Sequence, residues 1–422
     1  MTVPTRIPFP VVDEVARHCL QEEEPETVHI EVHLPGRLDP MRLRKAFTEA
    51  LHRHPRILMR EARGRWYRRR YEWELTAEPD VEVVSFPTPG RDALRDARTR
   101  ALVEAPPLSL SPPIRLEVVE PASGTVLFLT INHTALDGPA CLRVLATAAE
   151  LYGGKDNSPA APPVRAPETP QEQPLTPSNW SKPARVAQGT PEPSPGNGLL
   201  VTELPLPHRP KGSPYTVNDQ LMVTTALTIA HWNREHGAHP RPLRITMPVD
   251  DRPRDTTMPI GNGTRLVEVP FSPDELHDTT PAHMPTLLRR TATRTRALKS
   301  LPRPQLGHGA TLVTAPVTPV AWRAALTRGL RRAAAPWTST TLLSNIGRIP
   351  YPLDFGAEAG RAHAVWFSAP ARMPRGLTVT TASTAGRLHL ALRWSRALLG
   401  HGDGAHLRDL FEHYLHTTEA GT

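Results

Sequence analysis

Cysteine is scarce in this sequence, with Cys19 and Cys141 as its only two examples in 422 residues. Two cysteines cannot build a disulfide framework or a cysteine-based zinc site. Long apolar runs are also missing, because no segment approaches the roughly 20 continuous apolar residues of a membrane-spanning helix. The first residues lack the basic segment and apolar stretch of a secretory signal. These absences predict a soluble, cytoplasmic protein with reduced cysteines and no membrane partner.

Positive charge is in excess, but no nucleic-acid-binding motif accompanies it. The chain has 50 Lys+Arg against 42 Asp+Glu, which gives a net charge of +8. Such a charge suits nucleic acids, anionic membranes or acidic small partners. Most of the basic residues are arginines spread along the chain, and we recognise no nucleic-acid-binding module among them. Nucleic-acid binding therefore rests on charge alone, and we expect no nucleic-acid partner.

The histidines are numerous but do not predict a metal site. Of the 19 histidines, only His29 and His33 have the His-x-x-x-His spacing. This pair falls in a predicted strand, where the spacing separates the two side chains by roughly 13 Å. The ligands of one metal ion lie much closer together, so we expect no bound metal.

A proline-rich segment divides the chain into two portions. There are 11 prolines between Pro159 and Pro195, which excludes a long helix or a central strand there. Proline-rich segments of this kind form semi-extended connectors. We therefore predict an N-terminal lobe over 1–157, an inter-lobe connector over 158–198 and a C-terminal lobe over 199–422.

Both portions mix helices with strands, which predicts an α/β fold. Apolar periodicity and turn residues mark the elements. In the first portion we predict helices over 11–20 and 139–152, and strands over 28–34, 114–119 and 125–132. In the second portion we predict strands over 199–204, 243–249, 266–269, 377–381 and 388–394, and helices over 216–232, 281–298 and 406–416.

The most informative stretch runs from the apolar strand 125–132 into His133. Side chains alternate along a strand, so His133 shares a face with the apolar residues at 127, 129 and 131, while Asn132 points the other way. A histidine at a strand end, in the gap before a helix, is well placed to act as a base. Asp137 can fold back around the turn into an ion pair, and Gly138 permits backbone conformations that other residues resist.

The same stretch resembles a known motif. Asn132-His133-x-x-x-Asp137-Gly138 resembles the His-His-x-x-x-Asp-Gly motif of nonribosomal peptide synthetase condensation domains and the related coenzyme-A-dependent acyltransferases. Further segments resemble motifs of that superfamily, in the same order along the chain: Leu51–Arg60, Thr216–Asp219, Met247–Arg252, Ile260–Thr264 and Ser344–Arg348. Several motifs in one order support the resemblance more strongly than any single motif, whose false-positive risk is high.

The resemblance implies two chloramphenicol-acetyltransferase-like lobes in a V, with an active-site tunnel between them. It implies a stand-alone, monomeric acyltransferase of specialised metabolism. The donor would be a phosphopantetheine thioester, on an acyl or peptidyl carrier protein or as acyl-coenzyme A, and no cofactor would be bound permanently. His133 would act as the general base towards a small amine or alcohol acceptor, which gives an amide or an ester.

The resemblance also assigns roles around His133. Asp137 and Gly138 would shape the loop, with the Asp137 carboxylate paired to Arg252, or to Arg60 as a second choice. Loss of one partner of such a buried pair typically costs about 3–5 kcal/mol, so lost activity there would not prove a chemical role.

Four polar residues are candidates for the tunnel wall. Three interpretations are open for Asn262, Ser344 and Asn345: they line the tunnel, they donate to the developing oxyanion, or they are ordinary polar groups in turns. Asn132 stands where the superfamily has its first histidine and is counted with this substrate-binding group. The departure at Asn132 leaves open a catalytically inactive module that docks carrier proteins.

Overall fold

The computed structural model describes residues 5–65, 67–155, 181–253, 258–280, 282–300, 310 and 314–420. Of the predicted connector, residues 158–180 lie outside the described residues. Within the described part, no helix combines the length and the apolar character that a membrane crossing requires.

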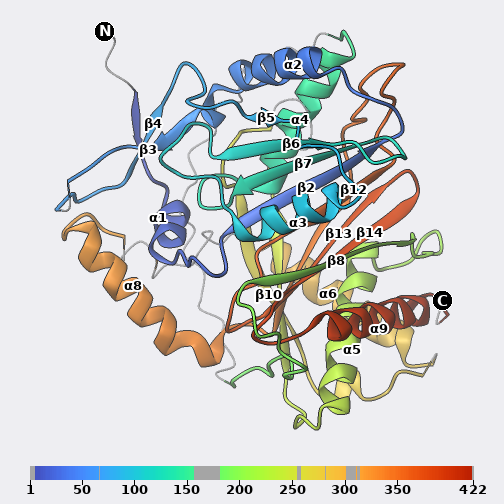
Figure 1. Ribbon diagram of the computed structural model, residues 1–422. Helices are drawn as coiled ribbons and strands as arrows, with labels where there is room; N and C mark the ends of the chain where they lie inside the picture. The colour runs from blue at the N-terminus through green and yellow to red at the C-terminus, as the bar shows by residue number, and fades with distance from the viewer. Residues whose placement is uncertain are drawn as a thin grey trace.

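A five-stranded sheet forms the centre of the N-terminal lobe (Figure 1). Its order is β12 (Ala364–Ser368), β2 (Thr27–Leu34), β7 (Thr125–Asn132), β6 (Ile114–Val119) and β5 (Val84–Ser85). The central strand β7 is buried along its whole length, because helices cover both faces of the sheet. Leu127, Leu129 and Ile131 join the core under α2 (Pro40–Arg53) and α4 (Gly138–Tyr152). Val126 and Phe128 pack on the opposite face with α3 (Ala93–Val103).

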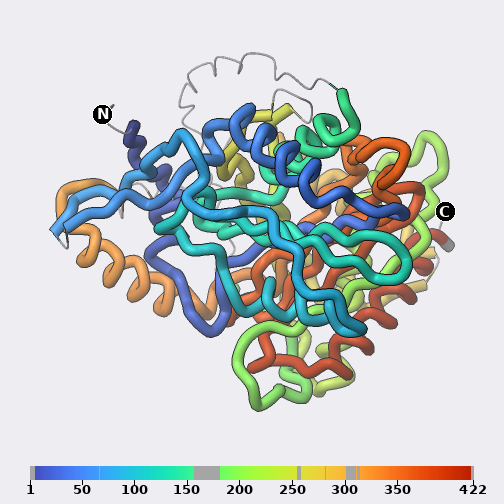
Figure 2. Tube along the Cα trace, turned by 45° about the horizontal axis from the view of Figure 1, so that its top comes forward, coloured from blue at the N-terminus to red at the C-terminus, as the bar shows by residue number. Residues whose placement is uncertain are grey.

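A small sheet and a short helix extend this lobe. The three strands are β1 (Arg6–Pro8), β4 (Glu72–Leu75) and β3 (Met59–Glu61), in that order. Helix α1 (Val11–His18) follows β1 and packs against α8 (Val320–Ala334) from the second half of the chain; Figures 1 and 2 both place these helices side by side.

The C-terminal lobe is built on a six-stranded sheet. Its order is β10 (Thr264–Phe271), β9 (Leu243–Asp250), β11 (Thr341–Arg348), β13 (Leu377–Thr384), β14 (Arg387–Ser395) and β8 (Asn197–Pro205). The helices α5 (Val217–Glu235), α6 (Met284–Ser300) and α9 (His401–Ala420) pack with this sheet. Helix α5 begins where the sequence predicts, because Thr216 and Asp219 form a reciprocal capping box.

The second half of the chain also contributes to the N-terminal lobe. Strand β12 pairs antiparallel with β2, from Ala364 opposite His33 to Ser368 opposite His29. Phe367 belongs to this strand and Phe355 precedes it along the chain. Both side chains join the core of the N-terminal lobe. No local pattern predicts this exchange, because β2 and β12 lie far apart along the chain. The exchange matters for function, since it brings β12 against the loop that carries His133.

Candidate active site

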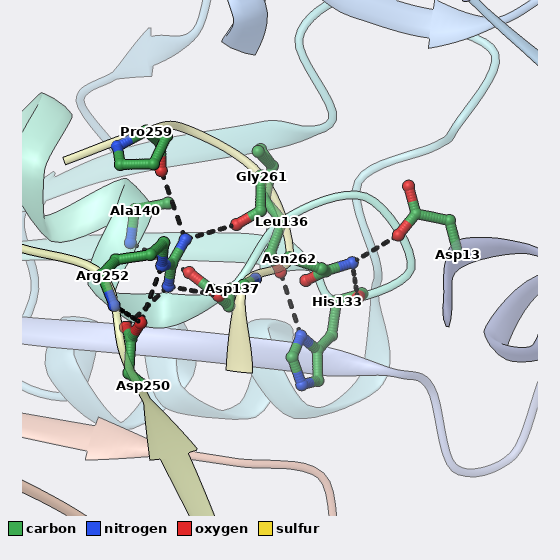
Figure 3. A network of polar contacts seen from close by, with 11 residues as sticks. Asp13, His133, Leu136, Asp137, Ala140, Asp250, Arg252, Pro259, Gly261 and Asn262 are labelled. Carbon is green, nitrogen blue, oxygen red and sulfur yellow. Dashed lines mark hydrogen bonds and ion pairs between the residues drawn. The ribbon is translucent and has the colours of Figure 1, made fainter. Parts of the chain in front are cut away.

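The loop between β7 and α4 holds His133 in one orientation. The His133 amide donates to the carbonyl of Glu26, at 2.8 Å, which continues the pairing of β7 with β2. The ring Nδ1 lies 3.0 Å from the carbonyl oxygen of Leu136. A carbonyl only accepts hydrogen bonds, so Nδ1 is the donor, and in the neutral imidazole Nε2 has the free lone pair. Figure 3 shows the ring with Nδ1 turned towards this carbonyl.

Asp137 is the N-cap of α4 and uses both carboxylate oxygens inside the protein. Its Oδ1 accepts from the amide of Ala140, at 3.0 Å. Its Oδ2 accepts from the Arg252 guanidinium at 2.6 Å and from the amide of Gly263 at 2.9 Å. With three donors on a buried carboxylate, Asp137 fixes the loop.

Arg252 connects three segments of the site (Figure 3). Besides Asp137, its guanidinium binds both oxygens of Asp250 at the end of β9, each at 2.8 Å. It also donates to the carbonyls of Pro259 and Gly261. Burial lowers the pKa of Arg252, but the hydrogen bonds and charges of Asp250 and Asp137 outweigh burial and raise it above the ordinary value. The loop of the N-terminal lobe is thereby tied to the sheet of the C-terminal lobe.

Asn262 braces the loop from the other side. Its side-chain amide donates to the carbonyls of His133, at 3.3 Å, and Thr134, at 3.1 Å. It also donates to the Asp13 carboxylate, at 2.9 Å, which in turn accepts from the Trp73 indole at 2.8 Å. Burial of Asp13 raises its pKa to about 6, although these two hydrogen bonds act in the opposite direction.

Two glycines lie where an added side chain would meet a close neighbour. A Cβ at Gly138 would lie 3.2 Å from the Phe367 ring of β12, and the backbone of Gly138 is not in the left-handed region. The expected need for unusual backbone freedom at Gly138 is therefore wrong, and the glycine instead makes room for Phe367. A Cβ at Gly263 would lie 2.3 Å from Nε of Arg252, so a larger residue there would displace the ion pair.

A cavity of about 390 Å³ lies between the two lobes, and His133 forms part of its wall. Pro139 and Leu142 of α4 line it from the N-terminal lobe, and Ser344 and Asn345 of β11 from the C-terminal lobe. The sheet strand that carries Ser344 lies beside β13, with Ser344 opposite Thr380, which also faces the cavity.

The polar groups predicted for the tunnel wall differ in what they offer a ligand. Asn345 donates to Asn218 and accepts from the Gly347 amide and the Thr381 hydroxyl. The Asn262 amide is directed at the loop. Among the described residues no hydrogen-bond partner is found for the Ser344 hydroxyl, so Ser344 is the group of this set that is best able to bind a substrate.

Two predicted site residues lie elsewhere. Asn132 is buried outside the cavity wall; its amide donates to the Pro106 carbonyl, and its oxygen accepts from the Thr134 amide. It shapes the loop, because strand alternation turns it away from the face of His133. Arg60 is not a partner of Asp137, since its guanidinium binds Glu74, at 2.6 Å, and Asp80, at 2.8 Å, beside the small sheet.

Sequence reasoning missed Asp13 and the contribution of β12. Asp13 lies in the first turn of an amphipathic helix, where the sequence pattern favours an acidic side chain that is exposed to solvent. Its burial depends on Trp73 and Asn262, which come from distant parts of the chain. Phe367 was missed for the same reason. The only sequence signal for the Phe367 contact was Gly138. A glycine there is consistent with a close neighbour and equally with an unusual backbone conformation.

Comparison with known proteins gives relatives in sequence and in structure. No family model matches the chain. Uncharacterized protein Rv2305 of Mycobacterium tuberculosis is 28% identical over 380 residues, which cover 82% of this chain and 84% of that protein. Uncharacterized protein MT2362, from another strain of the same species, has the same identity and coverage.

Solved structures similar to this chain are condensation and epimerization domains. The condensation domain of the Monacolin K polyketide synthase MokA has a TM-score of 0.63 and 13% identity, covering 99% of this chain and 98% of its own. The first condensation domain of the calcium-dependent antibiotic synthetase, in complex with a substrate analogue, has a TM-score of 0.64 and 13% identity, covering 99% and 97%.

The chain has the fold of a condensation domain. The epimerization domain of tyrocidine synthetase B is also similar, with a TM-score of 0.60 at 13% identity, covering 100% of this chain and 97% of its own. The expected α/β fold of two chloramphenicol-acetyltransferase-like lobes is therefore confirmed, and His133 lies where these lobes meet around the cavity.

Proposed function

We propose that this chain is an acyltransferase that joins an acyl thioester to an amine or a hydroxyl, with His133 as the general base. The donor is a phosphopantetheine thioester, held by a carrier protein or by coenzyme A, and no other cofactor takes part. The observation that carries the proposal is the histidine itself. Its Nδ1 is bound to the Leu136 carbonyl, and the ring faces a cavity that both lobes line.

The reaction follows from this arrangement. His133 Nε2 accepts the proton of the acceptor N–H or O–H while that atom attacks the thioester carbonyl carbon. The C–S bond then breaks, and the same proton passes to the thiolate that leaves. The new bond is an amide or an ester, and the second product is a free thiol. A positioned base contributes about 10²–10⁴-fold to such a step.

The loop supports this chemistry by holding the ring still. Asp137, Arg252 and Asn262 are all engaged in bonds within the protein and serve as positioning residues. Ser344 is the candidate donor to the oxyanion that develops on the thioester carbonyl. Alignment of the two substrates in the cavity supplies the remaining acceleration, since it makes a bimolecular step effectively unimolecular.

The test is transfer from a panel of acyl-loaded carrier proteins and acyl-coenzyme A to a mixed pool of amines and alcohols. Intact-protein and product mass spectrometry would follow both the donor and the new amide or ester. We expect His133→Ala to abolish transfer and Ser344→Ala to slow it by at least about tenfold. Arg60→Ala is the matched control, because Arg60 lies away from the cavity.

Other outcomes would contradict the proposal in distinct ways. Equal rates of acyl transfer by the wild type and by His133→Ala would exclude His133 as the general base. Tight carrier binding by both proteins without loss of the acyl group would favour the inactive docking module instead.

A further inference from the structure

Three arginines line the wall of the same cavity, and the proposed chemistry does not use them. Arg331 comes from α8, and Arg372 and Arg375 come from the segment between β12 and β13. The acidic residues of the cavity wall are Glu26, Asp137 and Asp250. Arg252 already binds both aspartates, so Glu26 alone remains to balance the three arginines. The three arginines therefore outnumber Glu26, the one carboxylate of the cavity wall that pairs with them.

The three guanidiniums differ in how they are held. Arg372 forms an ion pair with Glu26 and donates to the Cys19 carbonyl at 2.7 Å; its side chain is only 9% exposed. Arg375 binds hydroxyl groups, those of Ser339 at 3.0 Å and Thr246 at 3.4 Å. Neutral hydroxyls orient a guanidinium without compensating its charge.

Arg375 and Arg331 have no carboxylate within ion-pair distance among the described residues. Burial lowers the pKa of Arg375 to about 10; the charges of Glu268 and Glu26 oppose this shift, and those of Arg331 and Arg372 add to it. A buried cation such as Arg375 is unfavourable unless an anion pairs with it. The arrangement is thus one that a ligand anion would stabilise.

This region lies close to the reacting centre. The Glu26 carbonyl accepts the His133 amide, and the Glu26 side chain contacts Arg372. One residue, Glu26, therefore connects the His133 backbone to Arg372. The phosphate of a phosphopantetheine donor lies at the far end of its long arm from the thioester, and the thioester has to reach His133. An anion bound at Arg372 is therefore assigned to a small substrate rather than to that phosphate.

We propose that Arg331, Arg372 and Arg375 form a carboxylate subsite, which holds the acceptor by a carboxylate group while its amine or hydroxyl attacks. The role in transfer rests on the proposed function, whereas carboxylate binding does not. A planar guanidinium matches a carboxylate through paired, charge-assisted hydrogen bonds. The subsite would select amino acids or hydroxy acids over simple amines and alcohols.

Binding is tested first, without any need for catalysis. The full-length protein is titrated with succinate by calorimetry at constant ionic strength, with succinamide as the neutral probe. We expect succinate to bind and succinamide not to bind. Arg331→Gln and Arg375→Gln should each weaken succinate about tenfold, the effect of losing one charge-assisted contact.

A matched control separates the subsite from general charge. Arg332 is the neighbour of Arg331 on α8, is also exposed and is not among the residues that line the cavity. Arg332→Gln should leave succinate affinity unchanged. Equal weakening by Arg332→Gln, or equal binding of succinate and succinamide, would overturn the subsite. Arg331 is exposed, so Arg331→Gln keeps the test decisive even where Arg375→Gln does not fold.

The source of the carboxylate is tested by transfer. Glycine is compared with glycinamide as acceptor, and acetyl-coenzyme A with succinyl-coenzyme A as donor. We expect a preference of about tenfold or more for the carboxylated acceptor, lost in Arg375→Gln. A preference for the succinyl donor instead would overturn the assignment to the acceptor.

The two proposals fail separately. Succinate binding without any transfer would support the subsite and overturn the acyltransferase function. Transfer without succinate binding or acceptor preference would support the function and overturn the subsite.

Discussion

The two polar regions of the cavity wall satisfy their charges in opposite ways. Around His133, all four carboxylate oxygens of Asp137 and Asp250 accept from Arg252 or from backbone amides. At the arginine region, Arg375 binds only hydroxyls, and no partner is found for Arg331 among the described residues. In the first region every carboxylate oxygen has a donor, whereas in the second Arg331 and Arg375 have no carboxylate partner among the described residues.

This difference assigns the two regions different tasks. A network whose members are all paired is formed during folding and fixes geometry, since loss of any member leaves a buried charge. A region with excess charge gains its missing partner only when a ligand binds. Substitutions at the first region should therefore change stability, and substitutions at the second should change affinity.

The largest effect is expected from breaking the completed network. Asp137→Ala removes a helix cap and leaves Arg252 with one carboxylate fewer in a buried setting. We expect a loss of about 3–5 kcal/mol in the free energy of unfolding, measured by urea denaturation. Arg252→Ala should cost a similar amount, because both substitutions remove the same tie between the lobes.

Arg60 supplies the control for this experiment. It also binds two carboxylates, but its side chain is 35% exposed. Glu74 and Asp80 are 11% and 22% exposed, against 3% for Asp137, so the Arg60 pairs lie nearer to solvent than the pair of Arg252 and Asp137. Arg60→Ala should therefore cost less than Arg252→Ala. Equal losses of unfolding free energy in Arg60→Ala and Arg252→Ala would show that the position of Arg252 between the lobes does not add to its contribution to stability.

A pH-dependent effect of intermediate size is expected at Asp13, the buried end of the network. Burial raises the pKa of Asp13 from 3.8 to about 6, so the folded protein holds this proton more tightly than the unfolded chain does. As pH rises from about 4 to 6 the unfolded chain deprotonates first, and the folded state loses about 3 kcal/mol of relative stability. Asp13→Asn removes this titration.

The measurement is urea denaturation of wild type and Asp13→Asn across that pH range. The wild type should lose stability relative to the variant between pH 4 and about 6, and the difference should be constant at higher pH. A difference that does not change with pH would show that Asp13 is ionised throughout, held by Trp73 and Asn262.

The sequence predicted the parts of this site that depend on local patterns. Strand 125–132 and the helix after it were found because apolar alternation and a helix-start proline are local signals, and strand alternation correctly separated His133 from Asn132. The Arg252 pairing with Asp137 came through the resemblance. The burial of Asp13 depends on Trp73 and Asn262, which come from distant parts of the chain. The contact of Phe367 with Gly138 and the gathering of the arginines depend on β12 and α8 crossing to the other lobe. No local pattern encodes such a crossing.

The smallest effect is expected at the exposed member of the arginine region. Without a ligand, Arg331 repels Arg372 and Arg375 and gains no ion pair in return. Arg331→Gln should therefore leave the unliganded protein as stable as wild type or stabilise it by less than about 1 kcal/mol at low salt. Since salt screens exposed charges, the difference should shrink as ionic strength rises. Thermal unfolding of both proteins at low and high salt measures this, with Arg332→Gln beside them. A marked destabilisation by Arg331→Gln alone would mean that Arg331 has a partner within the fold, and the contrast between the two regions would then be lost.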